Sequence, residues 1–158
     1  FSASKQKTGL PHRLVLCGSD GPYSAEVHKA TFDSPFASDI FLTGYFPHES
    51  FPQLYAGSQG LIFPAVNEGV GLPVLEAMAT GVPVACASSG ALPEITGDAA
   101  MFFDPDNVQN LALVLEKLAT EPLLCAGMIQ KGLERAKMFN WETTVSQTVQ
   151  VAKSVAGK

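Results

Sequence analysis

The sequence predicts a doubly wound α/β domain, a parallel sheet covered by helices on both faces, with further helices at its C-terminal end. At 158 residues, the chain has the length of one domain. Five short apolar runs recur along it, and each interval between them has room for a helix and two loops. Hydrophobic residues make up 46% and charged residues 16%, against a usual charged share of about 25%. We therefore expect one domain over residues 1–158.

The expected strands are apolar at consecutive positions rather than at alternating ones, which is typical of strands buried on both faces. They cover the following residues: Leu14–Cys17, Ile40–Leu42, Leu61–Phe63, Val82–Ala85 and Met101–Phe103. Helix starts are marked by residues that cap helices or fit their first turn. These are Ser50 with Gln53, Asp106 with Gln109, Pro122, and Asn140 before Trp141. The polar residues before Leu14, which include Lys5 and Lys7, are typical of the end of a helix.

The charge balance argues against two kinds of partner. Lys and Arg number 10 and Asp and Glu 15, a formal net charge of −5, so no basic surplus exists to neutralise nucleic-acid phosphates or anionic lipid. The longest apolar stretch, residues 72–87, contains two prolines, a glycine and Glu76, and cannot form a membrane-spanning helix. Any membrane association is expected through parts of the protein outside this chain. The odd number of cysteines, Cys17, Cys86 and Cys125, without metal-ligand spacing predicts buried free thiols and a reducing compartment.

Residues 67–81, with the sequence NEGVGLPVLEAMATG, carry the pattern that points to chemistry. The segment follows the third expected strand, and Gly69 and Gly71 permit unusual backbone angles and close approach of a ligand. Pro73 fits the first turn of a helix and Gly81 its C-terminal end. Free N–H groups at such a helix start, at the carboxyl edge of a parallel sheet, form an anion site. The pattern therefore predicts a ligand site at this edge.

Two glutamates flank the start of this helix. Glu68 lies just before it, and Glu76 lies within a helix, Leu72–Thr80, that is apolar on every other side. We expect the helix to be buried, and an unpaired buried carboxylate costs several kcal/mol. A vicinal diol offers two donors to one carboxylate, so sugars and riboses are natural partners, and we expect both carboxylates in one pocket. Alternatively, Glu76 only complements the positive end of the helix.

With these residues the chain resembles a known family. Glu68 and Glu76 have the E-x7-E spacing, and the stretch EGVGLPVLEAMATGVPV is similar to the C-terminal, donor-binding domain of retaining GT-B glycosyltransferases, the group 1 family. The resemblance runs from about Leu14 to Trp141. It includes three shorter stretches: residues 54–58 (LYAGS), 92–94 (LPE) and 139–141 (FNW). The implied fold is a Rossmann-like parallel sheet that forms one half of a GT-B fold.

The resemblance also implies roles for single residues. Glu68 is the implied catalytic residue, in contact with hydroxyls of the donor sugar, and Glu76 is implied to hold the nucleotide ribose. The backbone beside the sugar and the diphosphate belongs to Gly69, Val70, Gly71 and Leu72. Val70 stands where the family often has Phe, and Ala65 where it often has Ser, which affects the shape of the sugar pocket. No cofactor and no metal is implied for binding the nucleotide sugar.

Three further residues are expected behind the site. Gly18 follows the first strand, and Ser89 and Gly90 follow the fourth; Gly18 fits a plain turn equally well. Asp104 and Asp106 have the spacing of a DxD metal motif, but a well-patterned helix begins directly afterwards, so we interpret Asp106 as its N-cap. We therefore predict no metal site.

Some parts of a transferase site are expected beyond this chain. The family supplies an Arg and a Lys to the leaving diphosphate from a loop after an early strand, and we expect both to lie outside these residues. The resemblance also implies an N-terminal acceptor-binding domain, to which a C-terminal helix over residues 141–155 crosses back. Part of the apolar face of that helix is expected to lack a partner. The implied location is the cytoplasm, or the cytoplasmic face of a membrane.

Two other functions compete with this interpretation. A receiver domain needs several acidic residues after the first strand and a Lys after the fifth, whereas this chain has only Asp20 and Asp104-Pro105-Asp106 at these places. A non-catalytic or regulatory module that binds a sugar nucleotide would carry the same donor motif. We therefore expect the donor-binding domain of an enzyme that moves a sugar from a nucleotide-diphosphate sugar to an acceptor, with the non-catalytic module as the alternative.

Overall fold

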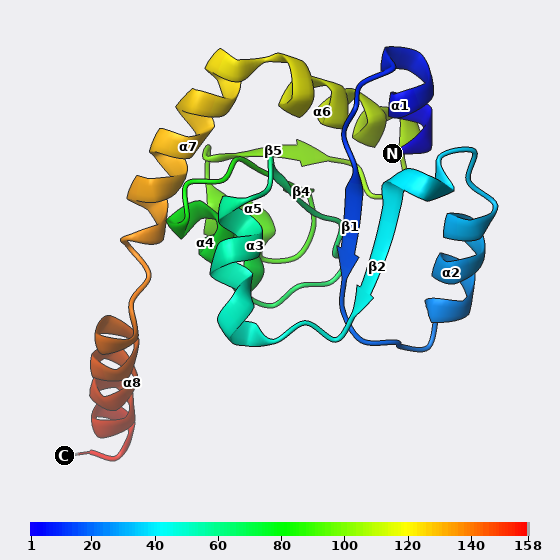
Figure 1. The fold of residues 1–158 in the computed structure, drawn as a ribbon. Helices are drawn as coiled ribbons and strands as arrows, with labels where there is room; N and C mark the ends of the chain where they lie inside the picture. Colours follow the sequence, from blue (N-terminus) through cyan, green and yellow to red (C-terminus); the bar gives the residue numbers. More distant parts are fainter. Residues whose placement is uncertain (158) are drawn as a thin grey trace.

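The computed structural model describes residues 1–157 and shows strands that alternate with helices along the chain (Figure 1). The strands are β1 (Leu14–Cys17), β2 (Ile40–Gly44), β3 (Leu61–Phe63), β4 (Val84–Ala87) and β5 (Ala100–Phe103). The α-helices are α1 (Ser2–Thr8), α2 (Ser24–Phe32), α3 (Phe51–Ala56), α4 (Leu72–Ala79), α5 (Leu92–Thr96), α6 (Val108–Thr120), α7 (Pro122–Ala136) and α8 (Trp141–Val155). Two short 3-10 helices, η1 (Ala37–Asp39) and η2 (His48–Ser50), precede β2 and α3.

All paired strands are parallel, as the predicted α/β class requires. β1 pairs with β2, while β3, β4 and β5 form a second group with β4 at its centre. The predicted fold class is therefore confirmed, but the expected single sheet is divided between β1 and β3 in the part of the chain that the structure describes. Figure 1 shows that β1 and β2 run in a different direction from β5.

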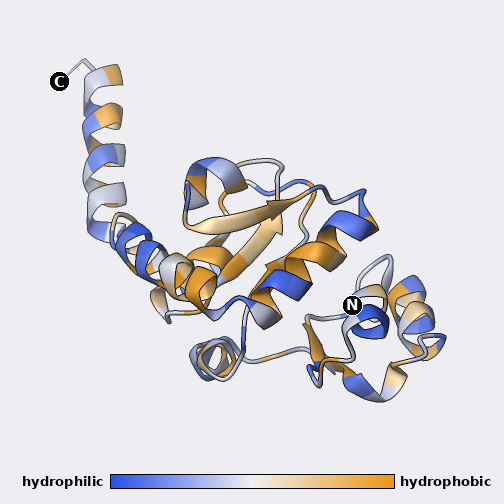
Figure 2. Ribbon diagram, turned by 90° about the horizontal axis from the view of Figure 1, so that it is seen from above, coloured by the Kyte–Doolittle hydropathy of each residue, from blue (hydrophilic) through white to orange (hydrophobic). Residues whose placement is uncertain are grey.

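The core of the domain surrounds β4, in which every residue is completely buried. The helices α4 and α7 pack against each other, and α6 packs against β5. At the α4–α7 contact Gly132 allows a close approach, because a Cβ atom there would lie 3.2 Å from Cγ of Met78. Figure 2 shows the apolar strands of this group enclosed by helices. The loops that follow β3 and β4 therefore begin at a well-packed core.

The fourth strand begins two residues later than predicted. Pro83 has no N–H to donate to a neighbouring strand, so it belongs to the turn before the strand. Its carbonyl accepts a hydrogen bond from the N–H of Leu61 at 3.0 Å, and regular pairing starts with Val84 opposite Leu61. The expected Val82–Ala85 strand is therefore observed as Val84–Ala87.

One of the three predicted helix caps is confirmed. The side chain of Asn140 accepts a hydrogen bond from the N–H of Thr143 at the start of α8. Asp106 is not the cap of α6, because Asn107 takes that place and accepts from the N–H of Asn110 at 2.9 Å. Ser50 precedes α3 but makes no capping hydrogen bond with its side chain. Both residues of an adjacent polar pair can cap a helix, and the sequence pattern alone selected the wrong one.

The three cysteines differ in their surroundings. Cys86 is buried as predicted, Cys125 is partly buried, and Cys17 is exposed, so the expectation of a buried thiol is wrong at Cys17. Its exposure follows from the division of the sheet, which leaves β1 uncovered. Burial raises the pKa of the Cys86 thiol to about 11 and also raises that of Cys125. All three are free in the structure.

The last helix, α8, projects from the rest of the domain (Figure 1). Its bounds, Trp141–Val155, match the predicted C-terminal helix, and none of its residues is buried. Trp141 is 74% exposed and Val155 83%, so the expected unpartnered apolar surface is present. No helix among residues 1–157 is both long and apolar enough to span a membrane.

Candidate functional site

The candidate site is built on the loop that joins β3 to α4 at the carboxyl end of the strand. Gly71, the last residue of this loop, has a φ of 79°, in the left-handed region that favours glycine. A Cβ atom at Gly71 would lie only 2.8 Å from Cδ2 of Leu92. The glycine therefore lets the loop pack tightly on α5 before α4 begins.

Glu68 is held by the backbone of its own loop. Its Oε1 accepts hydrogen bonds from the N–H groups of Gly69 at 3.0 Å and Val70 at 3.3 Å. Its backbone carbonyl accepts from the N–H of Ala91 at 3.0 Å, which ties the loop to the segment before α5. The other carboxylate oxygen, Oε2, has no hydrogen-bond partner among residues 1–157. The side chain is thus oriented while one oxygen remains free for a ligand.

Ser89 and Gly90 lie directly against this loop. The hydroxyl of Ser89 donates to the carbonyl of Ala65 at 2.8 Å. Gly90 has a φ of 57°, and a Cβ atom there would lie 2.6 Å from the backbone oxygen of Glu68. Ser89 and Gly90, which were expected behind the site, therefore both contact its loop. The absence of a side chain at Gly90 lets the Glu68 backbone lie directly against it.

Glu76 lies in the second turn of α4 and already has a protein partner. The hydroxyl of Tyr55, in α3, donates a hydrogen bond to Oε2 of Glu76 at 3.2 Å. Tyr55 is only 6% exposed, and burial together with the neighbouring Glu76 charge raises the pKa of its phenol. Glu76 thus accepts a hydroxyl donor from the protein itself. Tyr55 was missed because nothing in the local pattern relates it to a residue 21 positions away.

The remaining predicted residues are more open. Val70, in the loop, is 48% exposed, and Leu72 is 50% exposed. The expectation that α4 is buried is therefore wrong at both of its ends, because its last residue, Ala79, is exposed as well. Gly18 follows β1, and its N–H donates to the carbonyl of Gly44 at 3.1 Å. That hydrogen bond continues the β1–β2 pairing and fits the plain turn that was the alternative for Gly18.

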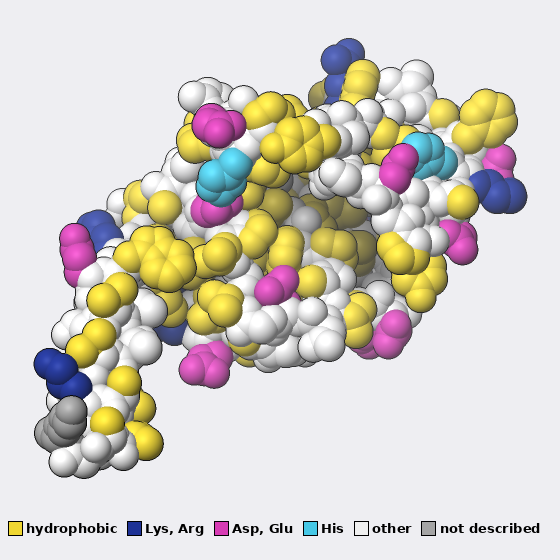
Figure 3. Space-filling view, turned by 90° about the horizontal axis from the view of Figure 1, so that it is seen from below, with side chains coloured by type: hydrophobic (Ala, Val, Ile, Leu, Met, Phe, Trp, Pro, Cys, Tyr) yellow, Lys and Arg dark blue, Asp and Glu magenta, His cyan; other side chains and the backbone are white. Residues whose placement is uncertain are grey.

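Positive charge is scarce around the site. No Lys or Arg occurs between Lys29 and Lys117, a stretch that contains both glutamates and their loop. Lys5, in α1, forms an ion pair with Asp39 at 2.7 Å. Arg13 lies over the ring of Phe41. Figure 3 looks at the face where β1 and β2 end, and there Lys and Arg lie only at the periphery, around a central hollow lined largely by hydrophobic atoms.

The DxD sequence forms part of a turn. Oδ1 of Asp104 accepts from the N–H of Asp106 at 3.0 Å, and the Asp104 N–H donates to Asn110 at 2.8 Å. These contacts fix the connection from β5 to α6. Among the residues that the structure describes, no three His, Cys, Asp or Glu side chains are grouped in a way that could hold a metal ion.

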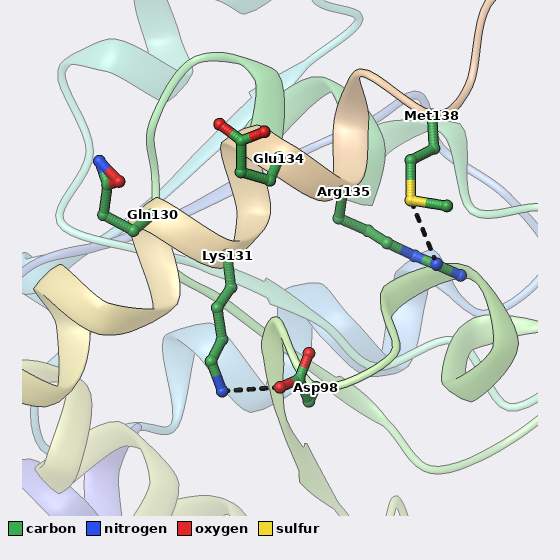
Figure 4. Close-up of a pocket in the computed structure, with 6 residues that line it drawn as sticks. All are labelled: Asp98, Gln130, Lys131, Glu134, Arg135 and Met138. Atoms are coloured by element: carbon green, nitrogen blue, oxygen red, sulfur yellow. Dashed lines mark hydrogen bonds and ion pairs between the residues drawn. The ribbon is translucent and has the colours of Figure 1, made fainter.

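A second hollow lies on α7, away from the loop of Glu68 (Figure 4). Lys131 pairs there with Asp98 at 2.7 Å. Arg135 donates to the backbone carbonyls of Glu94 and Ile95, so both cations fasten α7 to the α5 region. This hollow contains none of the predicted site residues, and its charged groups have structural partners.

The comparisons with known proteins agree with the fold and with the family that the sequence resembles. A family model described as glycosyl transferases group 1 matches residues 1–135. The O-antigen chain mannosyltransferase B of Escherichia coli is 38% identical over 147 residues, which cover 93% of this chain and 39% of that protein.

Two solved structures have the same fold over nearly the whole chain. Sucrose-phosphate synthase from Thermosynechococcus elongatus superposes with a TM-score of 0.85 at 22% identity, covering 99% of this chain and 42% of the synthase. Anabaena Alr3699/HepE, solved in complex with UDP and glucose, gives 0.82 at 20% identity, with 99% of this chain and 44% of that one covered. This chain thus spans about two fifths of the length of each of these three proteins.

Proposed function

This chain belongs to the group 1 glycosyl transferases, and we propose that it is the donor-binding domain of a retaining enzyme that transfers a sugar from a nucleotide-diphosphate sugar to an acceptor. The observation that carries the proposal is the geometry of Glu68, which is oriented by two backbone N–H groups and keeps one oxygen free. A carboxylate held in this way is prepared to accept hydroxyl donors. We assign Glu68 to hydroxyls of the donor sugar.

Glu76 is assigned to the ribose of the nucleotide. Its Oε2 accepts from Tyr55, which leaves Oε1 for ribose hydroxyls. The N–H of Leu72, in the first turn of α4, has no partner inside the helix and carries the positive end of the helix dipole. We place the diphosphate near this N–H and beside Gly69 to Gly71, between the two carboxylates.

The names of the relatives indicate the chemical class of the donor. The Anabaena structure contains UDP and glucose, and the Escherichia coli relative is named a mannosyltransferase. These names favour a nucleoside-diphosphate hexose, with glucose and mannose as the first sugars to test. Val70 is the side chain of this chain that we expect to shape the sugar pocket, since it is exposed on the loop beside Glu68.

During transfer, the bond between the sugar and the diphosphate breaks while negative charge grows on the leaving group. The residues of this chain bind and orient the donor, and the N-terminus of α4 faces the leaving group. No Lys or Arg lies between positions 29 and 117, so we propose that the cations that stabilise the leaving diphosphate come from residues outside this chain, as does the acceptor-binding domain. No metal or cofactor is part of the proposal.

The same scarcity of cations favours one alternative, a module that binds a sugar nucleotide without transferring the sugar. The two functions differ in the full-length protein. A transferase releases nucleoside diphosphate in the presence of an acceptor, whereas a binding module holds the donor unchanged. A donor that stays intact with every acceptor tested would favour the binding module.

The test of the site uses isothermal titration of the protein with nucleoside diphosphates and free hexoses. We expect binding of the nucleoside diphosphate to be the stronger. The variant Glu76→Gln should weaken it about tenfold or more, as expected for loss of a charged hydrogen-bond partner. It should leave binding of the 2′,3′-dideoxy analogue unchanged. Glu142→Gln, on the exposed helix α8, is the matched control. Equal weakening of both ligands by Glu76→Gln would show that Glu76 does not hold the ribose.

A further inference from the structure

The helix α3 has little local support of its own. It spans the six residues Phe51–Ala56, and Ser50, which precedes it, makes no capping hydrogen bond with its side chain. Helices this short are marginal in isolation, so packing determines where α3 lies. Two of its rings take part in that packing, because Tyr55 is buried and Phe51 packs against the hydrophobic core. The contacts of these two rings therefore fix the position of the helix.

The rings of Phe51 and Tyr55 stack on each other. The two residues are four positions apart and thus lie on the same face of the helix. Their ring centroids are 5.7 Å apart, with 29° between the ring planes. The hydroxyl of Tyr55 donates to Oε2 of Glu76, and because the phenolic oxygen lies in the plane of the ring, any tilt of the ring would move this donor. The stack therefore bears on the orientation of Glu76.

Phe46 extends the stack beyond the helix. It lies in the loop after β2, and its ring meets that of Phe51 edge to face, with centroids 5.4 Å apart and 64° between the planes. This is one of the favoured arrangements of an aromatic pair. The ring of His48, from the same loop, lies 6.1 Å from that of Phe51 at 58°. Phe51 thus contacts rings of the loop as well as the ring of Tyr55.

The loop that carries Phe46 begins at the carboxyl end of the β1–β2 pair. Gly44, the last residue of β2, has a φ of 63°, and its carbonyl accepts a hydrogen bond from the N–H of Gly18 at 3.1 Å. Glu76, in contrast, lies in α4, which follows β3 in the second group of strands. The rings of Phe46, Phe51 and Tyr55 therefore form a path of contacts from the first group to this carboxylate.

We propose that Phe46 and Phe51 are positioning residues for Glu76, because together they hold the ring of Tyr55 whose hydroxyl orients this carboxylate. The inference rests on the proposed function, in which Glu76 binds the nucleotide ribose. A carboxylate that is free to rotate must be ordered when the ribose binds, which lowers the affinity, whereas a preorganised carboxylate avoids this cost. Phe46 and Phe51 thus act on the ribose end of the ligand without contacting it.

The test is a double-mutant cycle, measured by titration calorimetry with a nucleoside diphosphate and with its 2′,3′-dideoxy analogue. Phe46→Leu removes the ring and keeps an apolar side chain. We expect it to weaken binding of the nucleoside diphosphate about threefold or more, and to leave binding of the dideoxy analogue unchanged. In the Tyr55→Phe background, where no hydroxyl holds Glu76, the same replacement should have no further effect. Phe32→Leu, at a ring in α2 that is 84% exposed, is the control.

Phe51→Leu is taken through the same cycle, and urea denaturation shows whether each variant is folded, so the test stands if one variant fails to fold. Equal weakening in both backgrounds, or of both ligands, would show that the rings only support the fold and would overturn the proposal.

The variant Glu76→Gln separates such a result from a failure of the proposed function. If Glu76→Gln weakens binding of the nucleoside diphosphate and the two phenylalanine variants bind it like the unchanged protein, only the positioning role is wrong. If Glu76→Gln binds it as tightly as the unchanged protein, the ribose assignment is wrong, and the positioning role fails with it.

Discussion

The phenol of Tyr55 donates a hydrogen bond to Oε2 of Glu76 across the contact between α3 and α4, with 3.2 Å between the oxygens. Tyr55 is buried, so its hydroxyl requires a partner and its ring is fixed by packing. The ring of Phe51, one helical turn earlier, stacks on that of Tyr55 with 5.7 Å between centroids. The orientation of the proposed ribose ligand Glu76 therefore depends on an aromatic cluster in the preceding helix.

Replacing Tyr55 with Phe removes this hydrogen bond and retains the ring. We expect the affinity for a nucleoside diphosphate to fall about three- to tenfold, the value of one hydrogen bond of roughly 0.5–1.5 kcal/mol. Titration calorimetry measures the change. Tyr45→Phe, at a side chain that is 76% exposed, is the control and should have no effect. If the two variants bind the nucleotide equally well, Tyr55 does not position Glu76.

Gly90 should be irreplaceable because of its contact with Glu68. Gly90 and Gly9 both have φ in the left-handed range, 57° and 65°, so alanine strains the backbone at both, by about 1–2 kcal/mol. At Gly90 the new Cβ would also lie 2.6 Å from the carbonyl oxygen of Glu68, whereas at Gly9 it would meet no atom within 4 Å.

We therefore expect Gly90→Ala to lower the free energy of unfolding by at least about 1 kcal/mol more than Gly9→Ala does. It should also reduce donor binding about tenfold or more, because the Glu68 loop must move. Urea denaturation and titration calorimetry measure the two effects. Equal losses of stability, with donor binding intact, would show that the loop tolerates displacement.

The sequence pattern and the structure assign the N-cap of α6 to different residues, Asp106 and Asn107. Asn107 accepts the N–H of Asn110, so Asn107→Ala should destabilise the domain by about 1 kcal/mol. Asp106→Ala, at the neighbour that the sequence pattern favoured, should cost less because the Asp106 side chain has no such bond in residues 1–157. Thermal unfolding of both variants measures the difference, and a larger loss for Asp106→Ala would contradict the observed cap.

The features that the sequence predicted correctly are those that depend on neighbouring residues. Continuous apolar runs located all five strands, and Asn140 correctly marked the start of α8, because these features depend on neighbouring residues. The link between Tyr55 and Glu76 and the contact of Gly90 with Glu68 join residues that are distant in the chain, and no short pattern encodes them. The exposure of Cys17 was missed for a different reason. Its run is as apolar as that of Cys86, but the division of the sheet leaves it uncovered.

The thiol of Cys86 should make the stability depend on alkaline pH. Burial raises its pKa from 9.0 to about 11 in the folded protein, so between these values the unfolded chain loses this proton first and is favoured. The free energy of unfolding should therefore fall by roughly 1–2 kcal/mol as the pH rises from 9 to 11. Cys86→Ala should flatten this part of the profile, while Cys17→Ala, at the exposed thiol, should retain it. Identical profiles for both variants would assign the effect to another group.

Finally, we expect this chain alone to bind a nucleotide sugar without transferring the sugar at a measurable rate. Glu68 and Glu76 can orient the donor, but orientation supplies only part of the acceleration. Loss of one preorganised donor at a site of developing charge costs about 2.7–4 kcal/mol, or 10²–10³ in rate. The stretch between Lys29 and Lys117 contains no cation that could contact the leaving diphosphate. The negative charge of the diphosphate would then be stabilised by the N-terminus of α4 alone. The measurement is release of nucleoside diphosphate by this chain and by the full-length protein, with the same donor and acceptor. Comparable turnover in both would show that the groups that stabilise the leaving diphosphate lie within these 158 residues.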